Sequence, residues 1–279
     1  MKPINFQLRR SLISIFRVGA LSYVGVCVLV AIGQRRMLYF PTKLTEGAAL
    51  ERAKGAQLEP WRDPHGAIIG WKRPAPRAAA RLVVFHGNGG CAADRRFYAD
   101  AFGAIDGGAA WEVSIFEYPG YGARDGSPSK DAFITAGRSA VEGLLAADNR
   151  PLFLFGESIG SGTAAALAGV LSGKIAGVVM MIPFARLQDV AQASFPWLPV
   201  ALLLRDKFDN LAALANCRAP AVFIIAENDE VVGAAQGRQL YDAYAGRKKL
   251  IVLPGATHNE FPSAPEERWF REVDSFLRE

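Results

Sequence analysis

The sequence FLFGESIGSG, at residues 153–162, decides which fold this chain is expected to adopt. An apolar run ends in the pattern G-x-S-x-G, and the small residues that follow it at 163–168 predict a helix. A serine on so sharp a turn holds its hydroxyl clear of the sheet, and the flanking glycines avoid a Cβ clash as the helix folds back. The alternative is an ordinary strand–helix connection in which Ser158 only caps the helix. The pattern favours a strand, a strained turn that presents Ser158, and a helix.

Apolar runs alternate with helical segments on both sides of this stretch. Continuous apolar strands are typical of sheets buried on both faces, so the alternation predicts an α/β fold with a mostly parallel, twisted sheet and helices on both faces. Ser127 is expected to cap the helix that begins at Lys130. The expected strands are 57–61, 67–72, 82–85, 113–118, 152–155, 176–182, 221–225 and 249–253, and the other expected helices are 94–105, 130–146, 234–244 and 265–277.

A segment of about 35 residues separates two of these strands. Residues 184–219 contain FPWLP at 195–199 and an apolar run after it. The segment is too short to be an independent domain, so we expect it to form a short lid.

The N-terminal part of the chain is unusually apolar. Residues 12–33 contain one charged side chain, Arg17, which is close enough to one end to reach the lipid headgroups. A helix of about 20 apolar residues crosses a bilayer core. Three interpretations compete: an uncleaved membrane anchor, a cleaved signal peptide and a buried helix. The length of the run and the arginines and aromatics at 35–41 favour the anchor.

These features give an expected domain organisation and topology. Residues 1–34 form a transmembrane anchor or signal segment, and residues 35–279 form one α/β domain whose lid occupies about 184–219. Basic residues before the apolar run outnumber those after it, which places the N-terminus in the cytoplasm and the large domain on the non-cytoplasmic side of the membrane. The residues counted are Lys2, Arg9, Arg10 and Arg17 before the run, and Arg35, Arg36 and Lys43 after it.

Composition excludes several other classes of function. The formal net charge of the 279 residues is +5, and the basic residues are spread along the chain, so a nucleic-acid partner is not expected. The three cysteines, Cys27, Cys91 and Cys217, form no C-x-x-C or Cys/His spacing. The sequence therefore predicts neither a metal site nor a disulfide framework.

A serine hydroxyl needs a base to remove its proton and a carboxylate to orient that base. The chain has three histidines: His65 in a predicted surface turn, His86 directly after a strand, and His258 in a loop after the last strand. Sites in parallel sheets lie at the carboxyl ends of the strands. We therefore expect His258 to be the base; the alternative is an ordinary histidine on a surface loop.

The carboxylate is expected between the serine and the histidine in the chain. Asp229 follows the strand at 221–225 and is the best candidate; its alternative role is helix N-capping. Glu227 and Glu230 are nearby alternatives, and Asp206 and Asp209 in the lid are weaker ones. The order Ser158, Asp229, His258 is the order of α/β-hydrolases.

An oxyanion that develops on the substrate needs fixed backbone N–H donors. One expected donor is Ile159, the residue after the serine, and the other is Asn88 in the loop HGNGG at 86–90, with Gly89 as the alternative. His86 is then expected to position this loop. A phosphate site at the glycines is disfavoured because the Walker lysine and G-x-G-x-x-G are both missing.

Together these motifs resemble the α/β-hydrolase superfamily, and they are most similar to its membrane-anchored branch, the ABHD-type and serine-aminopeptidase-like hydrolases. The likeness covers about residue 35 to the end. One position departs from the family pattern, because Arg124 stands where serine is usual. The matching positions are the patch at 35–41, the loop at 86–90, YPGYGARDG at 118–126, G-x-S-x-G at 156–160, Asp229 and His258.

The resemblance implies a serine hydrolase of carboxylic esters or thioesters that needs no metal or cofactor. The anchor and the aromatic patch indicate lipid or acylated substrates and a membrane location, whereas the sequence assigns no substrate-binding residue and no oligomeric state. A peptidase or aminopeptidase-like amide hydrolase is the alternative enzyme. A non-catalytic scaffold is disfavoured because Ser158, Asp229 and His258 are all present.

Overall fold

The computed structural model describes the backbone of residues 6–279 and the side chains of residues 9–279. Lys2, which contributes to the charge bias above, lies outside the described residues. Within them, an eight-stranded sheet has the order β10-β9-β8-β7-β4-β6-β3-β2. The strands are β2 (Glu59–Arg62), β3 (Ile68–Arg73), β4 (Ala80–Phe85), β6 (Trp111–Phe116), β7 (Leu152–Glu157), β8 (Gly177–Met181), β9 (Ala221–Ala226) and β10 (Lys248–Leu253).

The sheet is parallel from β6 to β10, and only β2 and β3 are antiparallel to their neighbours. The strands β4, β7 and β9 are buried along their whole length, which explains why their sequences are largely apolar. The predicted mostly parallel sheet is therefore confirmed.

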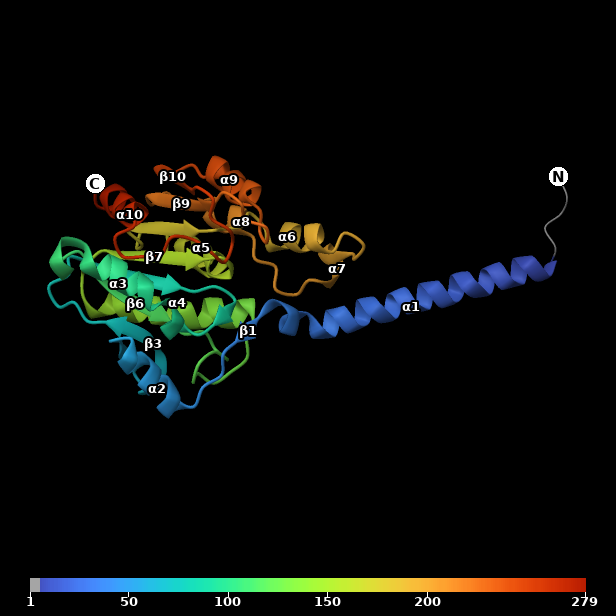
Figure 1. Ribbon diagram of the computed structural model, residues 1–279, viewed down its shortest axis with the longest axis horizontal. Coiled ribbons are helices and arrows are strands. Elements are labelled where there is room, and N and C mark those ends of the chain that lie inside the picture. The colour runs from blue at the N-terminus through green and yellow to red at the C-terminus, as the bar shows by residue number, and fades with distance from the viewer. Residues whose placement is uncertain (1–5) are drawn as a thin grey trace.

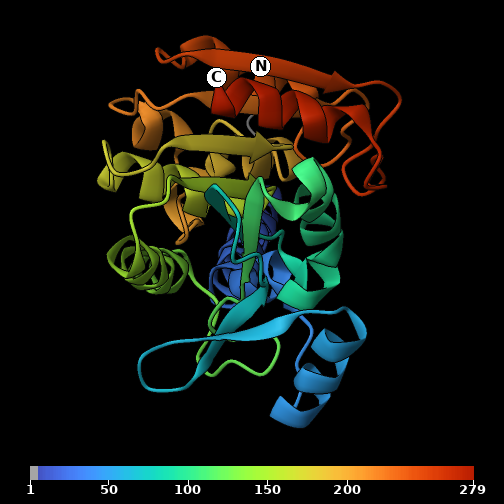
Figure 2. The same ribbon diagram turned by 90° about the vertical axis from the view of Figure 1, so that its left-hand side faces the viewer.

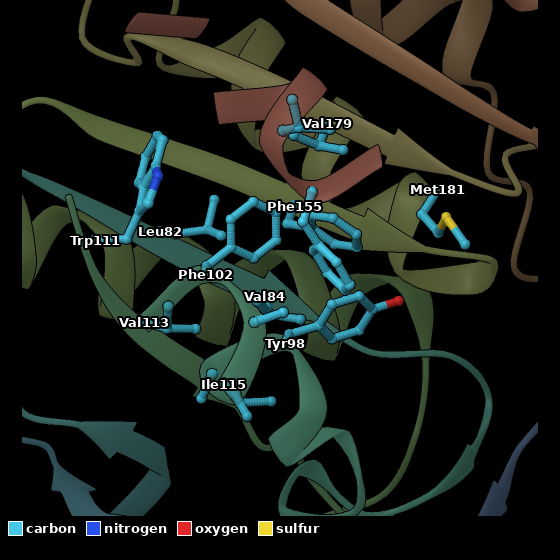
Figure 3. Packing of buried hydrophobic residues seen from close by; sticks show 14 of the residues in the cluster. Leu82, Val84, Tyr98, Phe102, Trp111, Val113, Ile115, Phe155, Val179 and Met181 are labelled. Carbon is cyan, nitrogen blue, oxygen red and sulfur yellow. The ribbon is translucent and has the colours of Figure 1, made fainter. Parts of the chain in front are cut away.

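Helices cover both faces of the sheet (Figure 2). The first face carries α2 (Glu46–Gly55), α3 (Arg96–Ala104) and α10 (Arg268–Arg278), and the second carries α4 (Lys130–Ala147), α5 (Ile159–Val170) and α9 (Ala234–Ala243). Figure 3 shows the core of the first face, where Tyr98 and Phe102 of α3 pack against strand side chains. Those side chains include Leu82, Val84, Trp111, Val113, Ile115 and Phe155.

Two of the differences from the sequence prediction concern helices. The helix α2 was not expected, because only Ala49 and Ala53 of its ten residues are buried and it carries no apolar stripe. Ser129, not Ser127, caps α4: its hydroxyl accepts a hydrogen bond from the N–H of Ala132 at 3.1 Å. An N-cap directly precedes the first helical residue, so Ser127 lies two residues too early to reach that N–H.

The lid and the N-terminal helix lie beyond the carboxyl ends of the strands (Figure 1). The lid consists of α6 (Leu187–Ser194), α7 (Val200–Leu203) and α8 (Asn210–Leu214). The helix α1 (Phe6–Leu38) extends away from the domain, and its part Arg9–Leu38 is long and apolar enough to cross a membrane; its most apolar 18 residues have a mean hydropathy of 2.2. The lid and α1 thus project from the same edge of the sheet.

Candidate active site

Ser158 occupies the sharp turn between β7 and α5. Its backbone has φ 51° and ψ −117°, a conformation that side-chain-bearing residues rarely adopt, and its hydroxyl makes no capping hydrogen bond to α5. This excludes the capping role that was the alternative for Ser158. Strain of this kind persists where the surrounding structure enforces it, and it clusters at functional sites.

The two glycines of G-x-S-x-G are required by close backbone contacts. A Cβ on Gly156 would lie 2.5 Å from the carbonyl oxygen of Gly160 in α5, as expected for a helix that folds back on its strand. A Cβ on Gly160 would lie 2.1 Å from the carbonyl oxygen of Phe85. The absence of a Cβ at Gly160 therefore allows the end of the neighbouring strand β4 to pack closely against α5. The sequence does not reveal this contact.

Three loops at the carboxyl edge bring Ser158, His258 and Asp229 together. The Oγ of Ser158 lies 3.0 Å from Nε2 of His258. The Nδ1 of His258 lies 3.0 Å from both carboxylate oxygens of Asp229. A proton on Nδ1 leaves Nε2 free to accept one from the serine, which is the arrangement that nucleophilic catalysis needs.

Asp229 is held as an anion. Burial on its own raises the pKa of this carboxyl group, but the hydrogen bond and charge of His258 outweigh that effect, with a further contribution from two backbone N–H groups. These N–H groups belong to Val231 and Val232 and donate to Oδ1 at 3.0 and 2.8 Å. The pKa of Asp229 therefore lies below its ordinary value.

The other acidic candidates have different partners. Glu227 accepts a hydrogen bond from the N–H of Gly255, and Glu230 accepts one from the N–H of His258, so both bind the backbone of the histidine loop. In the lid, Asp206 pairs with Arg35, and Asp209 caps α8 through the N–H of Ala212. Of the acids weighed from the sequence, Asp229 is the one whose carboxylate contacts the imidazole.

The loop at 86–90 lies next to the serine and is fixed from outside. The carbonyl of Asn88 accepts hydrogen bonds from the N–H of Phe40 and the hydroxyl of Tyr121, and its side-chain amide donates to the carbonyl of Leu38. The next residues form the short strand β5 (Gly89–Gly90), which pairs with β1 (Phe40–Pro41). The end of α1 and the segment that follows it thus hold the carbonyl group and the side chain of Asn88 in place.

Ile159 is the first residue of α5, where the backbone N–H groups of a helix have no intrahelical partner. The backbone N–H groups of Ile159 and Asn88 are the two that the sequence predicts as donors to an oxyanion. His86 is fully buried beneath this loop: its Nδ1 lies 2.8 Å from the carbonyl oxygen of Gly87, and its Nε2 lies 3.5 Å from Glu117. His65, in contrast, is exposed in the turn between β2 and β3.

A buried ion pair supports the serine turn, and sequence reasoning did not find it. Glu157 accepts hydrogen bonds from Nε and Nη2 of Arg95 at 2.8–3.0 Å and from the hydroxyl of Tyr98 at 3.0 Å. Burial raises the pKa of Glu157, but the charge and hydrogen bonds of Arg95 bring it below its ordinary value. The sequence did offer one signal: a glutamate at the end of a strand that is expected to be buried needs a partner of opposite charge.

Across residues 9–279, no three His, Cys, Asp or Glu side chains are grouped so that they could hold a metal ion.

Comparisons with known proteins agree with this fold. A family model described as the alpha/beta hydrolase fold matches residues 80–216. An uncharacterized protein of Mycobacterium tuberculosis is 32% identical over 269 residues, which cover 88% of this chain and 91% of that protein.

Two solved structures are similar to this one in fold. An esterase of Pyrococcus furiosus has a TM-score of 0.62 at 14% identity, covering 86% of this chain and 97% of the esterase. A monoacylglycerol lipase of Paleococcus ferrophilus has a TM-score of 0.52 at 21% identity, covering 71% of this chain and 93% of the lipase. The fold predicted from the motifs is confirmed.

Proposed function

This chain belongs to the α/β-hydrolase family, and we propose that within it the protein is a serine hydrolase of carboxylic esters or thioesters. One observation carries the proposal: an unbroken hydrogen-bonded series runs from the hydroxyl of Ser158 through the imidazole of His258 to the carboxylate of Asp229. The strained backbone of Ser158 supports the same role, since it aims the hydroxyl out of the sheet.

The proposed reaction proceeds through an acyl-enzyme. Nε2 of His258 takes the proton of Ser158 as Oγ attacks the acyl carbonyl, and Asp229 stabilises the imidazolium. The N–H groups of Asn88 and Ile159 bind the oxyanion of the tetrahedral intermediate. His258 then protonates the leaving alcohol or thiol. Water, activated by the same imidazole, attacks the acyl-enzyme, releases the carboxylic acid and restores the serine.

Lipid-like or acylated substrates are proposed from the position of the site. In this proposal residues 1–34 anchor the protein in a membrane, residues 35–279 form the hydrolase domain, and that domain lies on the non-cytoplasmic side. The apolar helix α1 leaves the domain at the edge of the sheet that carries Ser158. The similar folds of an esterase and a monoacylglycerol lipase support ester chemistry.

A fluorophosphonate probe tests the proposed nucleophile. We expect the purified full-length protein to be labelled and Ser158→Ala to remain unlabelled. Equal labelling of both, or of neither, would contradict the proposal and favour a scaffold function.

A substrate panel tests the reaction class. Matched acyl esters, acyl thioesters and aminoacyl amides are compared by kcat/KM. Higher values for the esters or thioesters are expected, whereas a preference for the amides would identify a peptidase.

A further inference from the structure

The outer part of the lid has an unusual surface for a protein in water. Residues 190–204, VAQASFPWLPVALLL, contain no charged side chain. Three of their large apolar side chains are exposed: Leu202 by 84%, Trp197 by 55% and Phe195 by 36%. We call residues 190–204 the outer lid. A contiguous apolar surface of this kind marks an interaction with a protein or a membrane.

The outer lid lies along the apolar part of α1. The hydroxyl of Tyr23 donates to the carbonyl of Trp197 at 2.8 Å, and the side-chain amide of Gln34 donates to the carbonyl of Leu203 at 2.9 Å. Tyr23 and Gln34 are eleven residues apart, which corresponds to about 16 Å along a helix that rises about 1.5 Å per residue. The lid thus follows α1 over roughly half the thickness of a bilayer core, which is about 30 Å.

Charged residues at the C-terminal end of α1 and directly after the outer lid lie at one level. Arg35 of α1 forms an ion pair with Asp206 at 2.9 Å, and the N–H of Arg205 donates to the side chain of Gln34 at 2.8 Å. Arg36 and Lys207 are adjacent in the sequence to these pairs. Basic side chains at the end of an apolar helix mark the headgroup level. From that level, α1 and the outer lid extend in the same direction, away from the sheet (Figure 1).

The carbonyl groups of the loop at 195–199 all have hydrogen-bond partners, which lowers the cost of placing them in hydrocarbon. The side-chain amide of Gln192 donates to the carbonyls of Phe195, Pro196 and Leu198 at 3.1–3.3 Å. The carbonyl of Trp197 is bonded by Tyr23, and that of Pro199 by the N–H of Leu202 at 2.9 Å. Pro196 and Pro199 carry no N–H to satisfy. Irregular backbone at membrane depth is tolerated only when its polar groups have partners.

We propose that the outer lid is inserted in the bilayer beside α1, so that lipid hydrocarbon covers Phe195, Trp197 and Leu202. The inference rests on the proposed anchor role of α1 and goes beyond it. The bilayer is favoured over a protein partner because the exposed surface is continuous with the apolar surface of α1. An apolar hollow lies between the two segments and is lined by Val30, Met37, Phe195 and Leu203, among others.

Tryptophan quenching tests the insertion in the full-length protein. The other tryptophans, Trp61, Trp71, Trp111 and Trp269, are buried in the hydrolase domain. In nanodiscs with phosphatidylcholine brominated in mid-chain, we expect clear quenching of the wild-type fluorescence. In Trp197→Phe the loss of fluorescence caused by the brominated lipid should be a small fraction of the loss in the wild type. Equal fractional quenching in the two proteins, or none in either, would overturn the proposal.

A pair of lysine variants provides a matched control. Leu202→Lys places a charge on the outer lid, whereas Val170→Lys places one at an exposed apolar position, 58% accessible, at the end of α5. Leu202→Lys should lower the quenching of Trp197 in discs, and Val170→Lys should leave it unchanged. Equal effects of the two lysines, or cross-linking that shows a second copy on the outer lid, would contradict insertion.

Two further measurements test the membrane anchor and the nucleophile independently of the insertion of the outer lid. Retention of the protein in the discs after alkaline carbonate washing reports on α1, and fluorophosphonate labelling reports on Ser158. A protein that is retained and labelled but shows no quenching of Trp197 refutes the insertion of the lid alone.

Discussion

Replacement of Asp229 by asparagine tests the proposed role of this carboxylate with almost no change of shape. Oδ1 of Asp229 accepts the N–H groups of Val231 and Val232, so the amide oxygen of the asparagine takes that position. The amide NH2 then takes the position of Oδ2, 3.0 Å from Nδ1 of His258. An NH2 group cannot accept a hydrogen bond. The oxygen at the Oδ1 position is also 3.0 Å from Nδ1 but already accepts two backbone N–H groups, so we expect Nδ1 to accept from the NH2 group and the ring proton to move to Nε2. In that tautomer the imidazole cannot take the proton of Ser158.

The expected loss follows from this wrong tautomer. A change of this kind lowers kcat by about 10⁴-fold, which corresponds to about 5 kcal/mol of transition-state stabilisation. The assay is steady-state hydrolysis of a short-chain ester by the full-length protein in detergent, with unfolding measured in parallel to show that the variant is folded.

Glu230→Gln is the matched control for this experiment. Glu230 is one residue away but accepts its hydrogen bond from the backbone N–H of His258, at 3.2 Å, and not from the ring. The amide oxygen of glutamine can still accept this bond, and even its loss would be worth only about 1 kcal/mol, so kcat should fall by less than about tenfold. The reasoning is refuted if Asp229→Asn keeps more than a tenth of the wild-type kcat, or if Glu230→Gln loses as much as Asp229→Asn does.

Three further substitutions test the support of the serine turn. Glu157→Gln leaves Arg95 without its buried partner and should lower the free energy of unfolding by about 3 kcal/mol at pH 7. Because the folded pKa of Glu157 lies below its ordinary value of about 4.3, the stabilisation is complete above that value and is lost as pH falls through the folded pKa. Denaturant unfolding in detergent should therefore show a wild-type advantage that shrinks below about pH 4, and a constant advantage would contradict the ion-pair account. Gly160→Ala should abolish soluble folded protein because its Cβ meets the carbonyl of Phe85, whereas Gly143→Ala, with open space around its Cβ in α4, should fold and be more stable by about 0.5–1 kcal/mol. Folding of Gly160→Ala with an unchanged melting temperature would show that the turn is looser than described. Ser158→Gly should relieve the positive φ and raise stability by about 1 kcal/mol relative to Ser158→Ala, and equal melting temperatures of the two variants would argue against strain at this turn.

The local features of the sheet were predictable from the sequence, because buried parallel strands are continuous apolar runs. The turn at Ser158 was predictable because glycine spacing and serine position are local properties. Asp229 and His258 each follow a strand, so topology alone brings them to one edge.

The features that were not predicted from the sequence depend on long-range contacts or on weak local signals. The pairing of Glu157 with Arg95 joins residues 62 positions apart, and no spacing rule links them. The contact of Gly160 with β4 requires knowledge of which strand is the neighbour of β7. The helix α2 has too little apolar surface to be visible as a pattern.

The short pairing of β1 with β5 has a practical consequence for anyone who removes the N-terminal helix to obtain a water-soluble enzyme. Leu38, Phe40 and Thr42 all make hydrogen bonds to the loop that contains Asn88 and Gly90. A truncation after residue 42 would delete these bonds together with the hydrophobic helix. Such a shortened protein would retain its nucleophile and base and would lose the outer brace of one proposed oxyanion donor. Its inactivity would then report on the position of the cut and not on any need for lipid.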